Sequence, residues 1–319
     1  MTFFLNPEIP LNDKLLEGLF MIMGFMCFYV ASKHLKNWQN HISRESFLFW
    51  GLLGTVLAFG RFIPSVVVGC LILIMTVPAI RKRVVPFKQL TKQKPAEAFQ
   101  NQGAKIFIPA LAIGIVAILC SFFTTISSLV GIGLGVLLSM LILHLYSRRN
   151  TAFVFLEDGA TMLENVGPLS ILPMLLASLG VIYTEAGVGD VVAKGIQSVV
   201  PKGNIFIGIV LLAVGMVIFT MIMGNSFASI TVMLVGVGYP FVLSYGVDPV
   251  IGMVALTCGS CGTLMTPMAA NFNIVPVNIL EMKDKYGVIK NQIVVSLILL
   301  VFQIGYMYFL VHYGSMFFS

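Results

Sequence analysis

The sequence predicts an all-α polytopic membrane protein with about eight transmembrane helices, one re-entrant hairpin and one unwound helix. Three observations predict this fold. The chain is 58% hydrophobic and only 10% charged, whereas a soluble domain carries about 25% charged residues. Apolar runs about as long as a membrane span recur along all 319 residues. Lys and Arg gather in a few loops, as cytoplasmic loops of membrane proteins do.

The apolar runs give the order of the spans. They cover residues 15–32, 47–60, 62–80, 106–123, 126–146, 167–184, 205–223, 226–246, 249–276 and 291–313. Arg61 and Pro64 interrupt the block 47–80, which we interpret as two spans joined by a tight turn. The N-terminus has no basic region or small-residue cleavage site before its apolar run, so we expect 15–32 to be a retained span.

The distribution of basic residues predicts the topology and the domain organisation. Residues 81–105 form the longest polar segment and are rich in Lys and Arg. With both termini outside, this segment and most of the 19 Lys and Arg residues lie in the cytoplasm. We expect residues 1–105 to form scaffold and oligomerisation helices with a basic cytoplasmic linker. Residues 106–319 would then form one transport repeat.

The segment 205–246 contains two long apolar runs joined by GNSFAS at 224–229. The positive-inside rule favours an even number of crossings for this segment, which two full spans and a re-entrant hairpin both satisfy. A join that reaches cytoplasmic water usually carries Lys or Arg, and this one has no charge. An uncharged Gly-Asn-Ser join fits better at membrane depth, where it contacts protein or a wet cavity. The sequence therefore favours a re-entrant hairpin over 205–246.

A second polar interruption, CGSCGTLMTPMAANFN at 258–273, lies inside the apolar run 249–276. We expect Gly259, Gly262 and Pro267 to unwind the helix here. Backbone groups freed at membrane depth need protein, water or ligand, and transporters use them to bind ions and substrates. In the alternative interpretation, small residues such as Gly224, Ser229 and Gly262 only permit close helix packing.

Neutral polar side chains at the two interruptions are the candidate substrate- and ion-binding residues. They are Asn225, Ser226, Gly262, Thr263, Thr266, Pro267, Asn271 and Asn273. Among them, Asn225, Ser226 and Thr263 are the candidate Na⁺ ligands. No carboxylate lies deep in a predicted span, which favours Na⁺ over H⁺ as the coupling ion. Glu157 and Glu164 share one helix face in the connection 147–166, which we interpret as a solvated amphipathic face.

Cys258 and Cys261 form a C-x-x-C pair, a spacing seen in thiol oxidoreductases and zinc sites. No basic residue lies between Asp248 and Lys283 to activate a thiol, and no His lies nearby to complete a zinc site. Packing is therefore the favoured role of the pair. We expect no cofactor, no enzymatic activity and no nucleic-acid partner.

The order of these motifs resembles one repeat of the ion transporter superfamily. That group includes the divalent anion:sodium symporters, the arsenite transporters and the gluconate permeases. The resemblance rests on Gly224-Asn225-Ser226 at the hairpin tip, followed by Gly262-Thr263, Thr266-Pro267 and Asn271. Tips of that superfamily are of the Ser-Asn-Thr type, so the Thr is absent here and Ser follows the Asn. The resemblance implies transport and leaves the identity of the ion ligands open.

More narrowly, the chain resembles the larger subunit of a two-component bacterial transporter associated with pyroglutamate (5-oxoproline) uptake. Residues 47–60, 155–180 and 258–276 carry this resemblance. It implies a multi-pass protein of the bacterial inner membrane that takes up a small carboxylate, with Na⁺ as the coupling ion. A complete superfamily carrier has two inverted copies of the tip and unwound helix, and one copy is visible here. We therefore expect a second, smaller membrane subunit and an oligomer. A thiol oxidoreductase and a non-transporting structural subunit are the alternatives.

Overall fold

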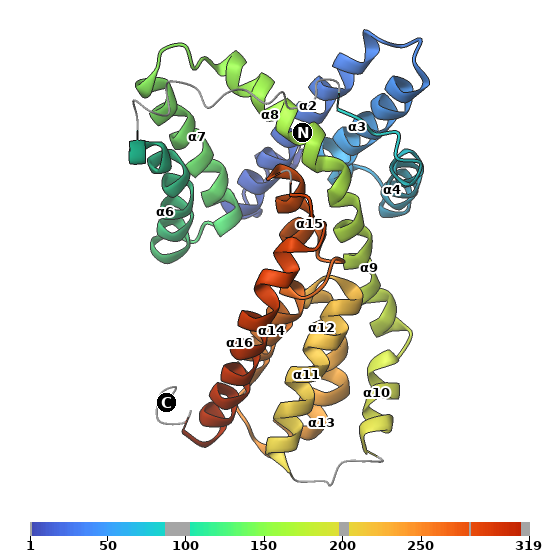
Figure 1. Cartoon of the computed structure of the whole chain (residues 1–319), viewed down its shortest axis with the longest axis vertical. Coiled ribbons are helices and arrows are strands. Elements are labelled where there is room, and N and C mark those ends of the chain that lie inside the picture. The colour runs from blue at the N-terminus through green and yellow to red at the C-terminus, as the bar shows by residue number, and fades with distance from the viewer. Residues whose placement is uncertain (1, 87–102, 198–203, 281, 314–319) are drawn as a thin grey trace. The chain divides into compact units, whose positions relative to one another are not determined.

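The computed structural model describes residues 2–86, 103–197, 204–280 and 282–313 (Figure 1). Every regular element in these residues is a helix, and none of them lies in a strand. The chain divides into two compact units, Met1–Pro168 and Leu169–Ser319. The all-α architecture predicted from the sequence is confirmed.

The first unit contains seven labelled α-helices among its described residues. They are α1 (Thr2–Leu5), α2 (Leu11–Leu35), α3 (His41–Phe59), α4 (Ser65–Ile80), α6 (Phe107–Phe123), α7 (Ser128–Tyr146) and α8 (Ala152–Val166). The compact units divide after Pro168 and not after residue 105, and α7 packs with α2, whereas the assignment of a transport repeat to residues 106–319 stays a prediction. Asn12 Oδ1 accepts a 2.7 Å hydrogen bond from the Ser127 backbone N–H, and Gly133 faces the side chain of Leu19. Packing, rather than the polar linker, sets the boundary.

Close helix crossings in the first unit depend on small residues. A Cβ atom at Gly24 of α2 would lie 2.6 Å from the Cβ of Ala58 in α3. A Cβ at Gly135 of α7 would lie 2.7 Å from the Cα of Ile113 in α6. Because lipid supplies little driving force for helix association, membrane helices rely on such close backbone approach. The glycines thus explain why α2 pairs with α3, and α6 with α7.

Helix α8 is held to α2 by acidic side chains. Glu164 Oε1 lies 2.9 Å from His34 Nε2, and the two side chains are only 1% and 3% exposed. About two turns earlier on the same face of α8, Glu157 accepts a 2.9 Å hydrogen bond from Tyr29 and lies 2.9 Å from Lys33 Nζ. The interpretation of this face as solvated is therefore wrong for Glu164. The acidic face of α8 has basic and phenolic partners on α2, which the sequence pattern alone does not reveal.

The second unit forms a bundle around α11, α14 and α16 (Figure 1). Its helices are α9 (Ile171–Glu185), α10 (Val188–Gln197), α11 (Ile205–Met223), α12 (Ser226–Met233), α13 (Tyr239–Phe241), α14 (Val250–Leu264), α15 (Ala270–Ile279) and α16 (Gly287–Tyr313). A π-helical turn, Leu234–Gly238, continues α12, and a 3-10 turn, Leu243–Tyr245, follows α13. Within the π-helical turn, Gly236 allows a close approach to the backbone of Gly189 in α10.

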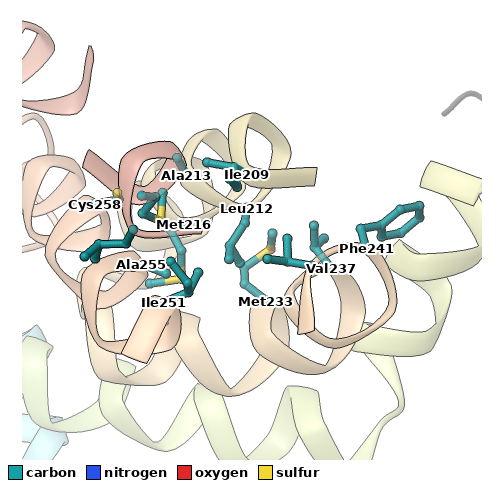
Figure 2. Packing of buried hydrophobic residues seen from close by; sticks show 13 residues of the cluster. Ile209, Leu212, Ala213, Met216, Met233, Val237, Phe241, Ile251, Ala255 and Cys258 are labelled. Atoms are coloured by element: carbon teal, nitrogen blue, oxygen red, sulfur yellow. The ribbon is translucent and has the colours of Figure 1, made fainter. Parts of the chain in front are cut away.

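The core of the second unit is continuous and apolar. Figure 2 shows side chains from α11, α12 and α14 meeting at its centre, and Met307 and Leu310 of α16 complete it. Ile209, Leu212, Met216 and Ile251 are each 0% or 1% exposed. Burying such side chains contributes about 1.5–3 kcal/mol each. This core fixes α11 against α14, and these two helices carry the polar interruptions.

Seven helices of the described residues are long and apolar enough to cross a membrane. They are Leu11–Leu35, His41–Phe62, Gly103–Phe123, Ser128–Tyr146, Ile205–Met223, Ser226–Tyr245 and Gly287–Tyr313. Two shorter apolar helices are Ser65–Ile80 and Val250–Leu264. These helices confirm a multi-pass membrane protein. Both arms of the predicted hairpin reach a spanning length, 19 and 20 residues, so length does not distinguish a re-entrant hairpin from two full spans.

Candidate functional site

The predicted helix break exists, but it is shorter and later than expected. Helix α14 runs without interruption to Leu264, and α15 begins at Ala270. Proline disfavours a helical conformation in the residue before it, so Pro267 places the break at 265–269. The prediction that Gly259 and Gly262 unwind the helix is wrong, because both lie within α14.

Gly259 and Gly262 instead let α14 approach the hairpin closely. A Cβ at Gly262 would lie 2.7 Å from the backbone oxygen of Val217 in α11. A Cβ at Gly259 would lie 2.9 Å from the Cβ of Ser226, the first residue of α12. The alternative interpretation, close packing by small residues, therefore describes these two glycines. Their packing places the tip directly against the last turns of α14.

This close approach gives a stability prediction. Gly262→Ala should lower the free energy of unfolding by about 1–3 kcal/mol, because the new methyl group meets backbone that cannot move aside. Thermal unfolding of the purified protein measures the loss. Gly252→Ala, in the same helix, is the matched control, since its Cβ would meet only Leu234 Cδ1 at 3.5 Å. Equal melting temperatures for the two variants would contradict the packing role of Gly262.

The carbonyl groups at the end of α14 are satisfied by side chains. A helix end leaves its last carbonyls without helical partners. Asn273 Nδ2 of α15 donates to the backbone oxygens of Thr263 at 2.6 Å and Thr266 at 2.7 Å. Ser296 Oγ of α16 donates to the backbone oxygen of Cys261 at 2.6 Å. Side chains of α15 and α16 thus stabilise the end of α14, and the break is a hydrogen-bonded part of the fold.

Thr266 joins the break to the hairpin. Its hydroxyl donates a 2.8 Å hydrogen bond to the backbone oxygen of Met221, in the last turn of α11, and accepts one from the Met268 N–H. Its side chain is 3% exposed. Thr266 therefore fixes the position of the unwound segment relative to the tip.

Asn273 has one polar atom without a partner. Both donated hydrogen bonds come from Nδ2, so the orientation of the amide is set by two acceptors and the remaining atom is Oδ1. Asn273 is 0% exposed, and its Oδ1 makes no hydrogen bond within the described part of the chain. Leaving a buried acceptor unsatisfied costs about 1–3 kcal/mol. A cation or a donor group bound at this oxygen would remove that cost.

The hairpin tip is a tight junction of two helices. Gly224 ends α11 in the left-handed region at φ 69°, which glycine adopts without strain. Asn225 caps α12, with its Oδ1 accepting a 2.8 Å bond from the Phe227 N–H. Inside the tip, Thr220 Oγ1 donates to Ser229 Oγ at 3.0 Å, and Ser229 donates to the backbone oxygen of Asn225 at 2.9 Å.

Three buried polar residues, Thr220, Ser229 and Ser296, are absent from the sequence-based candidate site residues. All three are 0% exposed, and each bonds within the hairpin or to the break. The available signal was a lone hydroxyl residue inside an otherwise apolar run. That signal is weak, because hydroxyl side chains in membrane helices commonly bond to their own backbone.

The predicted site residues fall into two groups. Ser226, Gly262, Thr263, Thr266 and Asn273 are buried at the junction of α11, α12, α14 and α15. Asn225 is half-buried at the tip, whereas Pro267 and Asn271 are exposed. The first turn of α15 has no side-chain cap, because Ala269 stands at the N-cap position. The junction thus combines buried neutral oxygens with an uncapped helix N-terminus that carries Asn271.

The cysteine pair lies in the apolar core. Figure 2 shows Cys258 among the hydrophobic side chains of α11 and α14, and it is 0% exposed. Cys261 is 4% exposed, and both thiols are free. Searching the described ranges finds no group of three or more His, Cys, Asp or Glu residues that could hold a metal ion. The geometry supports packing for both cysteines.

Comparison with known proteins gives a family. The family model described as "Protein of unknown function (DUF979)" matches residues 17–312. The chain belongs to this family. No curated protein and no solved structure matches it. The DUF979 match includes the hairpin, the break and the helices packed against them.

Proposed function

We propose that this DUF979 protein is a subunit of a secondary-active transporter that takes up a small carboxylate together with Na⁺. The unpartnered, fully buried Oδ1 of Asn273 is the observation that carries the proposal. It lies at a helix break that side chains from two other helices stabilise, next to an uncapped helix N-terminus. Discontinuous helices of this kind form the binding sites of many secondary transporters.

The cation would bind among neutral oxygens. Asn273 Oδ1 is one available ligand, and the buried hydroxyls of Ser226 and Thr263 lie at the same junction. Thr263 Oγ1 donates its proton to the Ser260 backbone oxygen at 2.6 Å, which leaves its lone pairs as acceptors. The proposed Na⁺ ligands are therefore Asn273, Thr263 and Ser226. Asn225 uses its side-chain oxygen to cap α12, so it is a weaker candidate than the sequence indicated.

The carboxylate would bind at the N-terminus of α15. A helix N-terminus carries free N–H groups and about half a positive charge, both of which favour an anion. Asn271 lies exposed in this first turn and offers one donor group and one acceptor to the substrate. Pyroglutamate, the substrate suggested by the sequence resemblance, has a carboxylate and a ring amide that match such a pair of sites. Asn271 would then distinguish it from simple carboxylates.

The proposal includes a second subunit and a location. One tip and one broken helix supply half of the binding unit that the resemblance implies, so a smaller membrane subunit would supply the rest. Apolar helices place the protein in a membrane, and the resemblance indicates the bacterial inner membrane.

The test is uptake of labelled pyroglutamate into proteoliposomes that contain this chain, the smaller subunit or both. We expect uptake driven by an inward Na⁺ gradient only when both subunits are present. Replacing Na⁺ by K⁺ should abolish it, and unlabelled acetate should compete less well than unlabelled pyroglutamate. Uptake by the smaller subunit alone would show that this chain is a structural subunit, and equal uptake in K⁺ would exclude Na⁺ coupling.

Substitution of the cysteine pair distinguishes a transporter from a thiol oxidoreductase. Cys258→Ala/Cys261→Ala should retain Na⁺-driven uptake within about twofold, because small apolar side chains suit the packed positions of both cysteines. The same proteoliposome assay measures this result. Loss of uptake in a variant that still folds, as judged by its melting temperature, would instead favour a membrane thiol oxidoreductase.

A further inference from the structure

An apolar groove lies between α2 and α3 in the first unit, far along the chain from the transport residues. Its volume is about 380 Å³, within the range of ligand-binding pockets. The residues that line it are Phe28, Ala31, Ser32, Leu35, Phe47, Leu48, Gly51, Leu52 and Thr55. They come from the last two turns of α2 and the middle of α3, so one end of the groove lies toward the loop 36–40.

The hydroxyl groups in the groove do not make it polar. Ser32 Oγ donates to the Tyr29 backbone oxygen at 2.6 Å, and Thr55 Oγ1 donates to the Gly51 backbone oxygen at 2.8 Å. Each hydroxyl is therefore satisfied within its own helix. Leu35 and Leu48 contribute exposed apolar surface, at 48% and 43% exposed. A hydrocarbon chain suits this lining, whereas a polar ligand would lose its hydrogen bonds to water without replacement.

Two cations stand at the loop end of the groove. Lys36 follows Ser32 by one helical turn, and Arg44 precedes Leu48 by one turn, so each lies on the groove face of its helix. Both are exposed, and neither has an acidic partner within salt-bridge distance among the residues that the structure describes. The Arg44 Nε–H donates to the Trp38 backbone oxygen at 2.6 Å, which holds the guanidinium near this end.

Trp38, in the loop between α2 and α3, is a residue type that favours the membrane interface. Its ring packs edge-to-face on Phe47 of the groove at 5.4 Å between centroids, and it lies 5.7 Å from the Arg44 guanidinium carbon. Tryptophan concentrates at the headgroup level of membranes. Trp38 is 47% exposed, as such a position requires. The apolar surface of the groove therefore gives way to cationic surface beside a residue type that favours the headgroup level.

We propose that the α2–α3 groove binds one anionic phospholipid, with an acyl chain along the groove and the phosphate between Lys36 and Arg44. The positive charge of Lys36 and Arg44 at the loop end favours an anionic phospholipid over other occupants. A helix of another subunit crossing the groove would continue past its end and bury two cations that have no acidic partner among the described residues, which is unfavourable. A phospholipid ends at that depth and neutralises them. Clusters of basic residues at the cytoplasmic ends of membrane helices bind anionic headgroups in this way.

The proposal is independent of the transported substrate, and lipid binding tests it directly. Detergent-purified full-length protein is titrated with phosphatidylglycerol or with phosphatidylcholine, and bound lipid is counted by native mass spectrometry. Each cation near an anionic headgroup favours binding about fivefold. Wild-type protein should therefore bind phosphatidylglycerol at least fivefold more tightly, and Lys36→Gln/Arg44→Gln should remove that preference.

Three further variants distinguish lipid binding in the groove from lipid binding to a diffuse basic surface. Gly51→Leu fills the groove and should weaken binding of both lipids; a Cβ at Gly51 meets no atom within 4 Å, and the melting temperature of the variant checks that the fold is intact. Gly69→Leu, on α4 with equally open surroundings, is its control. Arg148→Gln/Arg149→Gln removes the same charge from another exposed loop. Equal affinity for the two lipids, full binding by Gly51→Leu, or an equal loss in Arg148→Gln/Arg149→Gln would each overturn the proposal.

Discussion

Asn273→Ala should raise the Na⁺ concentration for half-maximal uptake by about 10- to 100-fold. The substitution removes the buried Oδ1, and an interaction of a neutral oxygen with a charged group contributes about 1.5–3 kcal/mol. Initial rates of labelled pyroglutamate uptake, measured over a range of Na⁺ concentrations, give the shift.

The same substitution should also destabilise the fold, and the two effects are separable. Loss of Nδ2 leaves the backbone oxygens of Thr263 and Thr266 without their donor, which should cost about 2–4 kcal/mol. A purely structural role would lower the amount of active protein at every Na⁺ concentration and leave the half-saturating concentration unchanged. Binding at Oδ1 requires that this concentration moves.

Asn278→Ala provides the matched control. Asn278 lies on the same helix but is exposed. We expect its half-saturating Na⁺ concentration and its melting temperature to equal those of the wild type. If Asn273→Ala behaves like Asn278→Ala in both measurements, the cation site is not at this break.

Helix positions could be predicted from the sequence because the ends of apolar runs carry strong local signals. The predicted run 205–223 coincides with α11, Ile205–Met223. Asn204 caps its first turn through the Ile207 N–H, and Gly224 ends it in the left-handed region. Hydrophobicity and capping are both properties of neighbouring residues, so a single sequence contains them.

The roles of the glycines in α14 could not be predicted in the same way. Glycine both weakens a helix and permits close helix packing, so the residues around Gly262 in the sequence are consistent with either role. The decision depends on the backbone oxygen of Val217, which the fold brings to 2.7 Å from the position of a Cβ. Asn273 is a candidate by residue type, but its unpartnered oxygen follows only from the two carbonyls that orient its amide.

The buried pair of His34 and Glu164 is the clearest contact that sequence could not supply. The two residues are 130 positions apart, and each lies near polar neighbours that suggest a solvated surface. Glu157 shares the face of Glu164 and is indeed partly exposed, with 42% of its side chain accessible. One helix face therefore contains a buried and a partly exposed acid, and only packing of α8 on α2 distinguishes them.

Glu164→Leu should lower the free energy of unfolding by about 3–5 kcal/mol, because it leaves the polar ring of His34 buried without its carboxylate partner. His34→Leu should have a similar cost, because it leaves the carboxylate of Glu164 buried without its imidazole partner. The double variant His34→Leu/Glu164→Leu should be more stable than either single variant, since two apolar side chains replace a pair whose desolvation offsets most of its attraction. Melting of the three purified variants completes the double-mutant cycle.

Glu157→Leu, the same substitution on the same helix, separates burial from charge. Glu157 is 42% exposed and contacts both Lys33 and Tyr29, and water can replace it at both partners, so its loss should cost at most about 1 kcal/mol. A loss as large as that of Glu164→Leu would mean that α8 is held by its total charge. A double variant as unstable as the sum of its singles would mean that His34 and Glu164 stabilise α8 through separate partners. If Glu164→Leu is the more destabilising substitution, the buried pair of His34 and Glu164 stabilises the packing of α8 on α2 more than the partly exposed pair of Lys33 and Glu157 does.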